Sequence, residues 1–560
     1  MFDKKKLAEI RTAQKEWEEK NAQEFPKERK AEFLSDSGIP LKRFYTPLDL
    51  EEKGFDYRAD LGFPGEYPYT RGATPTMYRR FIWAMAKYTG FPTPEESNKN
   101  WRSQVEAGLN VLSIAYDLPT QQGYDPDHPL SEGEVGRVGV SMCSLRDWEV
   151  ALEGIDVGQV LVNQVMNAAG AVGIASHLAI AEKQGVDLAK LRGTCQNDIL
   201  KEYTARGNYI FPPKQALRMV CDALYYCGQR MPSYRPIEVC GQHLAEKGAT
   251  PLHEAASCLA NAFTYLQSAV DRGMDIDIVA PGVNFFTSIR HTGFFEEIAK
   301  HRAMRRVYAR TLKEHFGAKN PRSLTCRLVP AQGGMGLHRE QYLNNIARTA
   351  IAAVEAALAG VQAMALASYD EQFGIPTVEA NITALRCQQV VAYETGIADV
   401  VDPLAGSYFV EWLTSEFEER IMKELETIDR LGGVLRGIEQ GYFQRQYADD
   451  AFRWQKAFES GEVQRVGVNC FTEEEDSRPS RIYRADPKIE ALRVTAVQEL
   501  RRSRDNGRVQ KSLEELKQVA SGESSMMPPI IEAVKAYATT GEICDTLREV
   551  WGEYVEPHIL

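Results

Sequence analysis

The fold of this chain is decided by two runs, LRGTCQN at residues 191–197 and IEVCGQH at residues 237–243. Each run is partly apolar and rich in strand-forming residues, ends in polar residues, and is followed by a helix-patterned segment. This order is typical of parallel βα units. Because a closed barrel of such units places its chemistry at the carboxyl ends of the strands, we expect Gln196, Arg206 and His243 near one rim.

The same alternation of strand and helix patterns continues on both sides of these runs. Helical patterns, such as residues 294–316 and 349–358, fill the gaps between eight strand candidates. Eight strands over roughly 300 residues predict an α/β protein built as a (β/α)₈ TIM barrel. An open, doubly wound sheet fits the strand count nearly as well, and periodicity alone does not separate the two. The candidates are residues 111–116, 160–167, 191–196, 237–242, 284–289, 323–329, 361–367 and 400–403.

Several strand candidates carry small or polar residues where a filled barrel would carry Val, Ile or Leu. Such residues favour a barrel with an open bore that admits an elongated ligand. Close backbone packing at the glycines explains them about as well. The residues are Gly193, Thr194, Gly241, Ser288 and Ala363.

Shifts in composition divide the chain into three parts. Residues 1–40 are rich in Lys, Glu and Ala and predict a solvated helical arm that wraps a partner. Residues 41–480 hold the predicted barrel, with a short helical segment at residues 81–88 and a helix start capped by Thr93. Residues 481–560 predict a C-terminal extension of four helices, at residues 488–503, 507–520, 529–538 and 540–554.

The overall composition is that of an ordinary globular protein. The chain has 560 residues, of which 44% are hydrophobic and 26% charged, and its formal net charge is −12. This acidic charge argues against nucleic acid as a partner. No apolar run is long enough to span a membrane, and the first residues lack the apolar core of a signal peptide, so we expect a cytoplasmic protein.

The cysteines and histidines show no metal-binding pattern. The ten cysteines contain no CxxC pair, and the nine histidines have no metal-ligand spacing. We therefore expect no metal site and no disulfide framework in this chain, but reduced and mostly buried thiols.

Six longer motifs stand in order along the chain. They are AKYTGFPTPEESN (86–98), LSIAYDLPTQQGYD (112–125), GTCQNDILKEY (193–203), YIFPP (209–213), VDPLAGSYFVE (401–411) and VGVN (466–469). Together they resemble the large chain of the methylmalonyl-CoA mutase family over residues 40–475. The resemblance implies a TIM barrel with an acyl-CoA threading the barrel axis and adenosylcobalamin stacked on the carboxyl rim.

The family's cobalt-binding motif is missing from this sequence. Family members hold cobalamin on a flavodoxin-like domain, whose D-x-H-x-x-G motif gives a histidine to cobalt. None of the nine histidines here has Asp two residues before it and Gly three residues after it. The chain also stops where that domain would begin. We therefore expect a hetero-oligomer in which a separate small subunit holds most of the adenosylcobalamin.

The resemblance implies catalytic roles for three residues. Arg206 matches the arginine that pairs with the free carboxylate of a malonyl-type substrate, which a guanidinium fork can bind through two hydrogen bonds. His243 matches the histidine that hydrogen-bonds the migrating thioester carbonyl. Tyr88 matches the tyrosine beside the substrate and the adenosyl group. Without the family motifs, a solvated arginine, a strand-end histidine and a core tyrosine would be the ordinary interpretations.

Three further residues are expected to face the cofactor. Glu371 matches the acid that contacts the ribose of the adenosyl group. Gln242 replaces the tyrosine that precedes the histidine in the family. Ala115 stands where the 2-hydroxyacyl mutase of the family carries an aspartate, which disfavours that activity.

The resemblance implies a CoA site that is only partly retained. Three family arginines are replaced here, by Phe81, Ala86 and Gly282, which would weaken the binding of phosphate groups. The basic residues that could compensate are Arg79, Arg80 and Lys87. The retained substrate-binding positions are Thr76, Met77, Gln196 and Gln362.

These residues predict the large subunit of an adenosylcobalamin-dependent carbon-skeleton mutase, an isomerase that rearranges a carboxylated acyl thioester by a radical route. One alternative is a family mutase for an unusual or non-CoA acid, and another is an isobutyryl- or 2-hydroxyisobutyryl-CoA mutase large subunit. A third alternative is a non-catalytic barrel that partners a true mutase. The retained Arg206, His243, Tyr88 and Glu371 argue against the third.

Overall fold

The computed structural model describes residues 3–556, apart from residues 87, 107, 110, 375, 474–485 and 487. All the strand pairings that form its barrel are parallel. The strands are β1 (Ala84–Ala86), β2 (Tyr88–Thr89), β3 (Val111–Ala115), β4 (Leu161–Val165), β5 (Gly193–Cys195), β6 (Tyr234–Arg235), β7 (Ile237–Cys240), β8 (Val283–Phe286) and β9 (Ala363–Ala365).

The pairings join eight strand positions into a closed ring. Strands β2 to β6 pair in chain order, β7 pairs with β8, and β9 pairs with β1. Only residue 87 separates β1 from β2 in the chain, and only Pro236 separates β6 from β7. The seventh position consists of isolated bridges: Leu328 pairs with Phe285, and Ala331 pairs with both Ser288 and Ala365. This closure makes the fold a (β/α)₈ barrel and excludes the open sheet.

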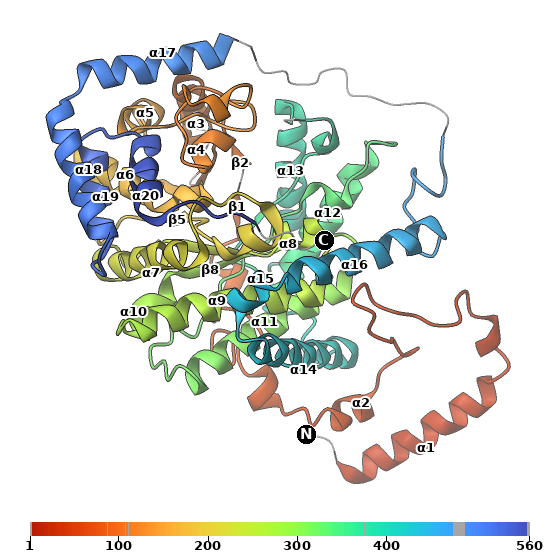
Figure 1. Cartoon of the computed structure of the whole chain (residues 1–560). Helices are drawn as coiled ribbons and strands as arrows, with labels where there is room; N and C mark the ends of the chain where they lie inside the picture. The colour runs from red at the N-terminus through yellow and green to blue at the C-terminus, as the bar shows by residue number, and fades with distance from the viewer. Residues whose placement is uncertain are drawn as a thin grey trace.

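Helices follow the strands and surround the barrel (Figure 1). Local sequence signals set their starts: the side chain of Thr250 caps α9, and Pro251 occupies its first turn, where no amide hydrogen is needed. The predicted cap Thr93 likewise accepts a hydrogen bond from the backbone of Glu96 in α3. The helices of the barrel region are α2 (Pro47–Glu52), α3 (Pro94–Glu106), α4 (Leu118–Gln121), α5 (Leu145–Ala151), α6 (Gly170–Lys183), α7 (Pro213–Arg230), α8 (Gln242–Lys247), α9 (Pro251–Asp271), α10 (Ile276–Val279), α11 (Phe294–Glu314), α12 (Asn344–Ala359), α13 (Val378–Glu394), α14 (Tyr408–Arg430), α15 (Val434–Glu439) and α16 (Tyr442–Glu459).

Seven of the eight strand candidates contain a strand or a bridge, and the candidate at residues 400–403 is wrong. These residues form bends and turns. The backbone of Asp402 has a φ of 50°, and its carboxylate lies 2.5 Å from Arg302 of α11. A left-handed residue fixed by an ion pair cannot continue an extended strand.

The helical segment predicted at residues 81–88 is also wrong, because this stretch supplies the missing strand position as β1 and β2. Ala84 pairs with Ala363, and Tyr88 pairs with Ser113. A short apolar run fits a buried strand as well as a helix. Neighbours that are distant in sequence provide the ladder here, so the local pattern could not identify the strand.

Three of the five small strand residues face the outer layer instead of the bore. A Cβ atom on Gly193 would lie 2.2 Å from the ring of Tyr234, and one on Gly241 would lie 2.6 Å from Sγ of Cys258. The hydroxyl of Ser288 donates to Glu254 of α9. Close packing against the outer layer therefore explains these positions, and among the five the clearest residue on the bore side is Thr194.

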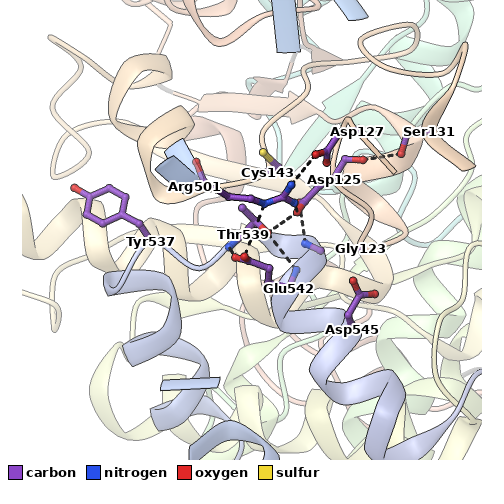
Figure 2. A network of polar contacts seen from close by, with 12 residues as sticks. Gly123, Asp125, Asp127, Ser131, Cys143, Arg501, Tyr537, Thr539, Glu542 and Asp545 are labelled. Carbon is purple, nitrogen blue, oxygen red and sulfur yellow. Dashed lines mark hydrogen bonds and ion pairs between the residues drawn. The ribbon is translucent and has the colours of Figure 1, made fainter. Parts of the chain in front are cut away.

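The C-terminal part of the chain contains the four predicted helices, as α17 (Lys488–Ser503), α18 (Asn506–Ala520), α19 (Met527–Lys535) and α20 (Thr540–Trp551). It docks on the loop after β3 through the buried carboxylate of Asp125 (Figure 2). This carboxylate accepts hydrogen bonds from Arg501 at 2.6 Å, from the backbone of Gly541 at 2.9 Å, and from the hydroxyl of Thr539. The extension thereby holds a loop that also carries residues of the site.

The N-terminal helix α1 (Lys4–Asn21) stands away from the barrel (Figure 1). Most of its residues are exposed, and Leu7 is its one fully buried side chain. This agrees with a solvated arm, whereas the partner that it would wrap stays a prediction. The predicted boundary between barrel and extension, at residues 480 and 481, lies outside the described residues.

All ten cysteines are free thiols, and nine of them are buried, as predicted. Over the described part of the chain, no helix combines the length and apolar character that crossing a bilayer requires.

Candidate active site

Polar residues at the ends of β5 and β7 meet at the carboxyl rim, as the sequence predicts. Residues 196–201 lead from β5 into the short π-helix η6 (Glu202–Arg206), and α8 begins two residues after β7 ends. The backbone amide of Cys240 donates to the carboxylate of Asp198 at 2.7 Å, which ties the two βα units together. Gln196, Arg206 and His243 consequently belong to one cluster.

Lys201 is the centre of this cluster, although no sequence motif predicts a role for it. Its side chain is fully buried. Its Nζ atom lies 2.6 Å from Glu202, 2.8 Å from Asn167, 2.9 Å from Nδ1 of His243 and 3.1 Å from Gln196. Burying an ammonium is tolerated only when charge and hydrogen bonds compensate it, and these four contacts do so. The sequence does contain one sign of a buried lysine: Lys201 directly follows two apolar residues, Ile199 and Leu200.

His243 is a neutral imidazole. Its pKa is lowered well below the ordinary value of 6.5 by burial and then by the charges of Lys201 and Arg206. Its Nδ1 atom also lies 3.4 Å from Sγ of Cys240. Burial raises the pKa of that thiol to about 12, so it keeps its proton. Both groups next to Nδ1 can therefore donate a hydrogen bond to it.

Arg206 lies at the end of η6 with its side chain 23% exposed. Its Nη1 atom donates to Oε1 of Gln121 at 2.9 Å and lies 3.5 Å from the carboxylate of Glu202. Among the described residues, none accepts a hydrogen bond from its Nη2 or Nε atoms. One side of the guanidinium fork is thus held by the protein, and the other side is free to bind a carboxylate.

Tyr88 faces the bore of the barrel. It pairs with Ser113 across a parallel ladder, and paired residues project to the same face of a sheet. The side chain of Ser113 accepts a hydrogen bond from Asn163, which in turn accepts one from Thr194. Tyr88 is 48% exposed. The pKa of its phenol is nevertheless raised, because the effect of burial exceeds the opposing effect of the Arg206 charge. Solvent therefore reaches the ring of Tyr88, and Arg206 is close enough to act on its phenol.

The polar side chains that face the bore include an acid for which no sequence motif predicts a role, Glu238 of β7. Its side chain is buried, and Oε2 has no hydrogen-bond partner among the described residues. Burial raises its pKa to about 7, against the opposing effects of Thr194, Asn284 and Arg235. Glu238 and Asn284 are paired across β7 and β8, so both belong to the wall of the bore.

The three residues expected at the cofactor lie at the carboxyl rim. Ala115 is the last residue of β3. Gln242 starts α8, and its amide donates to Glu246 at 2.8 Å. Burial, Asp370 and Glu246 together raise the pKa of Glu371 to about 7. The carboxyl groups of Glu371 and Glu246 lie near each other, beside the carboxamide of Gln242. These groups can form hydrogen bonds with the paired hydroxyls of a ribose, so they fit the adenosyl group that the resemblance implies.

The remaining substrate positions are divided between the two ends of the barrel. Gln196 lies at the carboxyl end, with its carbonyl oxygen bound to Lys201. Met77 packs near Gly360, and the backbone amide of Ala84 donates to Gln362 at 3.0 Å, which places Thr76, Met77 and Gln362 at the amino end. The side-chain oxygen of Gln362 already accepts the backbone amide of Leu328. This spread suits a ligand that runs along the axis.

Four arginines gather at the amino end of the barrel, where three arginines of the family are missing. Arg235 pairs with Thr194 and therefore faces the bore. Arg192 stands directly before β5 begins, two residues before Thr194. Burial and the charges of Arg327, Arg322 and Arg192 lower the pKa of Arg235 to about 9, against the opposing charge of Glu238.

These four arginines, Arg192, Arg235, Arg322 and Arg327, have no ion-pair partner among the described residues. The Nε atom of Arg235 is buried without a hydrogen bond. The replaced position 282 lies against the residue that follows Arg235, because a Cβ atom on Gly282 would lie 3.2 Å from the side chain of Pro236. Among the described residues, Glu238 is the one acid that acts on the pKa of Arg235, so positive charge remains in excess here and suits an anion. Position 81, by contrast, is a largely exposed phenylalanine.

The cavity on the outside of the barrel is separate from this site. A cavity of about 1230 Å³ lies on the outside of the barrel between α9, α11 and α14, lined by residues such as Phe263, Arg310 and Met422. Within the described part of the chain, no group of three or more His, Cys, Asp or Glu side chains could hold a metal ion.

Comparison with known proteins agrees with this geometry. A family model described as methylmalonyl-CoA mutase matches residues 34–553. The 2-hydroxyisobutanoyl-CoA mutase large subunit of Aquincola tertiaricarbonis is 41% identical over 98% of this chain and 98% of its own length. The methylmalonyl-CoA mutase of Rhizobium meliloti is 37% identical over 92% of this chain and 72% of its own, and the human mitochondrial enzyme is 35% identical over 92% and 68%. The chain therefore belongs to the methylmalonyl-CoA mutase family.

Proposed function

We propose that this chain is the large subunit of an adenosylcobalamin-dependent mutase that rearranges a carboxylated acyl thioester. The observation that carries the proposal is the guanidinium of Arg206, one side of which has no hydrogen-bond acceptor among the described residues. The charge of this group acts on both Tyr88 and the neutral His243. A substrate carboxylate would take the free side of the fork. Malonyl- and succinyl-type acyl groups have such a carboxylate, whereas isobutyryl and 2-hydroxyisobutyryl groups do not.

Each residue of the cluster has a distinct task in this proposal. Adenosylcobalamin, when bound, supplies the organic radical that removes a hydrogen from the substrate. Arg206 fixes the carboxylate and with it the orientation of the acyl group. His243, kept neutral, donates a hydrogen bond to the thioester carbonyl as that group migrates. Tyr88 closes the bore on one side and excludes water from the reacting carbons.

We infer that the thioester carrier is coenzyme A. A carrier that threads the barrel would bring its phosphate groups to the amino end, where Arg192, Arg235, Arg322 and Arg327 give an excess of positive charge. Charge-assisted hydrogen bonds from arginine are among the strongest contacts to phosphate. In this proposal, these four arginines supply the positive charge that the family carries at positions 81, 86 and 282.

The proposed partner is a small subunit that holds most of the cobalamin. Two observations support it: the sequence lacks the D-x-H-x-x-G motif, and a relative matched over 98% of its length is named a large subunit. On the side of this chain, Glu371 and Gln242 would contact the adenosyl ribose, and Ala115 would face the cofactor from β3.

The proposal is tested by reconstitution with a small cobalamin-binding subunit and adenosylcobalamin. The complex is assayed with methylmalonyl-CoA, ethylmalonyl-CoA and succinyl-CoA, and in parallel with isobutyryl-CoA and 2-hydroxyisobutyryl-CoA. We expect rearrangement of a carboxylated substrate. Turnover confined to the substrates without a carboxylate would overturn the role of Arg206, and no turnover of any ester would favour a non-CoA acid or a non-catalytic barrel.

A matched binding experiment tests the division between subunits. The chain alone is incubated with adenosylcobalamin and passed over a gel-filtration column. We expect it to lose the cofactor, and the complex with the small subunit to retain it. Stoichiometric retention by this chain alone would contradict the split.

A further inference from the structure

We propose that Lys201 is a positioning residue that holds His243 in the tautomer able to donate from Nε2. The inference rests on the proposed function for its catalytic meaning. Its structural basis is the contact of 2.9 Å between Nζ of Lys201 and Nδ1 of His243.

Hydrogen-bond accounting around Lys201 fixes the direction of this contact. An ammonium group only donates, so every partner of Lys201 must offer a lone pair. The carboxylate of Glu202 and the carbonyl oxygens of Asn167 and Gln196 do so. The imidazole can accept only through an unprotonated nitrogen, and the nitrogen that faces Lys201 is Nδ1. In a neutral ring the hydrogen then sits on Nε2.

Cys240 supports the same tautomer from another element. Its Sγ atom lies 3.4 Å from Nδ1 of His243. Burial keeps the group in the thiol form, which can donate a hydrogen bond to Nδ1, so no thiolate is present to accept one from Nδ1. The acids of the cluster do not reverse the assignment. Glu202 is bound to Lys201, and Asp198 accepts from the backbone of Cys240 and from the hydroxyl of Tyr265. Arg206 adds a second positive charge that disfavours the imidazolium.

The consequence for the reaction is a hydrogen-bond donor without a transferable charge. A histidine with its hydrogen on Nδ1 would offer the thioester carbonyl a lone pair, which repels an oxygen. An imidazolium would place a full charge and an acidic proton beside a reactive intermediate. Fixing the tautomer of an imidazole through its second nitrogen is a general device in enzymes, and the wrong tautomer is costly to catalysis.

The test reads the ring nitrogens of His243 directly. The full chain is labelled with ¹⁵N in its histidine rings, and the signal of His243 is identified in solid-state NMR spectra by its loss in His243→Gln. We expect the wild type to have an unprotonated Nδ1 and a protonated Nε2 throughout the range of about pH 5 to 7, in which an ordinary histidine titrates. A protonated Nδ1 in the wild type would overturn the proposal outright.

Lys201→Met removes the donor while keeping most of the side-chain volume. We expect the variant to lose the single tautomer and to protonate His243 within the same pH range. Because Glu202 would be left without its cation, the double variant Lys201→Met, Glu202→Gln repeats the experiment without a buried unpaired charge. If both variants fold and keep the wild-type tautomer, Lys201 has only a structural role.

Lys300 provides the matched control. Among the described residues it is the other fully buried lysine with acid partners, Glu254 and Glu297, and it lies outside the cluster. Lys300→Met tests the loss of a buried ammonium and is expected to leave the His243 signals unchanged. In the reconstituted complex, we expect Lys201→Met to lower kcat about 100-fold or more with little change in KM, the size expected when one donor to a developing charge is lost. The NMR result stands without turnover, so failure of the substrate proposal and failure of this one are distinguishable.

Discussion

The guanidinium of Arg206 donates from Nη1 to the side-chain oxygen of Gln121 at 2.9 Å. Gln121 ends α4, in the loop after β3, and the same oxygen accepts hydrogen bonds from Asn167 and Asn208, each at 3.0 Å. Three donors on one oxygen leave Gln121 no freedom to rotate. The direction of the Arg206 fork is therefore set by a residue 85 positions away in the sequence.

Arg206→Gln should lower kcat/KM for a carboxylated acyl-CoA by about 100-fold or more, because it leaves the substrate carboxylate in the site without its charged partner, a loss of about 3–5 kcal/mol. Steady-state kinetics of the reconstituted complex measure the effect. The control is Arg436→Gln, which removes an exposed arginine paired with Glu439 and should leave kinetics unchanged. Full activity in Arg206→Gln would show that this arginine does not bind substrate.

The arginines at the amino end predict where CoA phosphates bind. In the double variant Arg235→Gln, Arg327→Gln, each lost charge should cost about 1–3 kcal/mol of binding free energy. Isothermal titration of the chain with CoA, dephospho-CoA and 4′-phosphopantetheine measures this loss and shows which phosphate is involved.

The comparison variant for this experiment is Arg79→Gln, Arg80→Gln, on the exposed segment before β1. We expect it to bind CoA nearly as well as the wild type. The opposite pattern, with binding lost only in this variant, would return the phosphate site to the exposed segment. Absence of CoA binding in the wild type would contradict a CoA carrier.

The buried carboxyl of Glu238 predicts a pH-dependent stability. Its folded-state pKa is raised from 4.5 to about 7. The folded state thus binds the proton more tightly than the unfolded state, and its stabilising effect is present below about pH 4.5 and is lost as the pH rises through 7. Glu238→Gln should therefore be more stable than the wild type at about pH 8, by an amount on the order of 3 kcal/mol at most, with little difference near pH 5.

Thermal unfolding of both proteins at the two pH values measures this difference. The exposed acid Glu439, replaced in Glu439→Gln, serves as the control and should give no pH-dependent change. A Glu238→Gln variant that loses stability equally at both pH values would mean that the carboxyl is ionised in the folded state.

Asp125 predicts how firmly the C-terminal extension is attached. Asp125→Ala should lower the free energy of unfolding by about 3–5 kcal/mol, because it leaves Arg501, Thr539 and the backbone of Gly541 without a buried acceptor (Figure 2). Hydrogen exchange should then accelerate first in α17 and α20. The neighbouring Asp545→Ala removes an exposed partner of Arg548 and should change little. Unchanged exchange in α17 and α20 would mean that apolar packing alone holds the extension.

Local sequence patterns were sufficient for most elements of the fold. Seven strand candidates and the four helices of the extension are confirmed, because their apolar periods, caps and prolines act within a few residues. The helix predicted at residues 81–88 is wrong, since the pairing partners of this stretch, Ala363 and Ser113, lie in other βα units. The candidate at residues 400–403 failed for a related reason: the ion pair between Asp402 and Arg302 overrides the local strand propensity.

The site divides in the same way. The motifs identified Arg206, His243 and Tyr88 as chemically distinctive residues, and the end-of-strand rule predicted that Gln196, Arg206 and His243 would gather at one rim. The roles of Lys201, Gln121 and Glu238 could not be inferred, because each depends on contacts across 42 or more residues or on facing the bore. Which side of a strand a residue faces depends on register, and register is set by the neighbouring strands.

The sequence by itself determined the order of the βα units, the starts and ends of most helices, the family, and the residue types available for chemistry. Only the tertiary structure decided that β1 and β2 close the ring, that Gly193 and Gly241 pack outward while Thr194 and Arg235 face the bore, and that Lys201 meets His243. The physical reason is that capping and periodicity are properties of neighbouring residues, whereas a buried ammonium or carboxyl takes its partner and its pKa from groups that only ring closure brings within hydrogen-bonding distance.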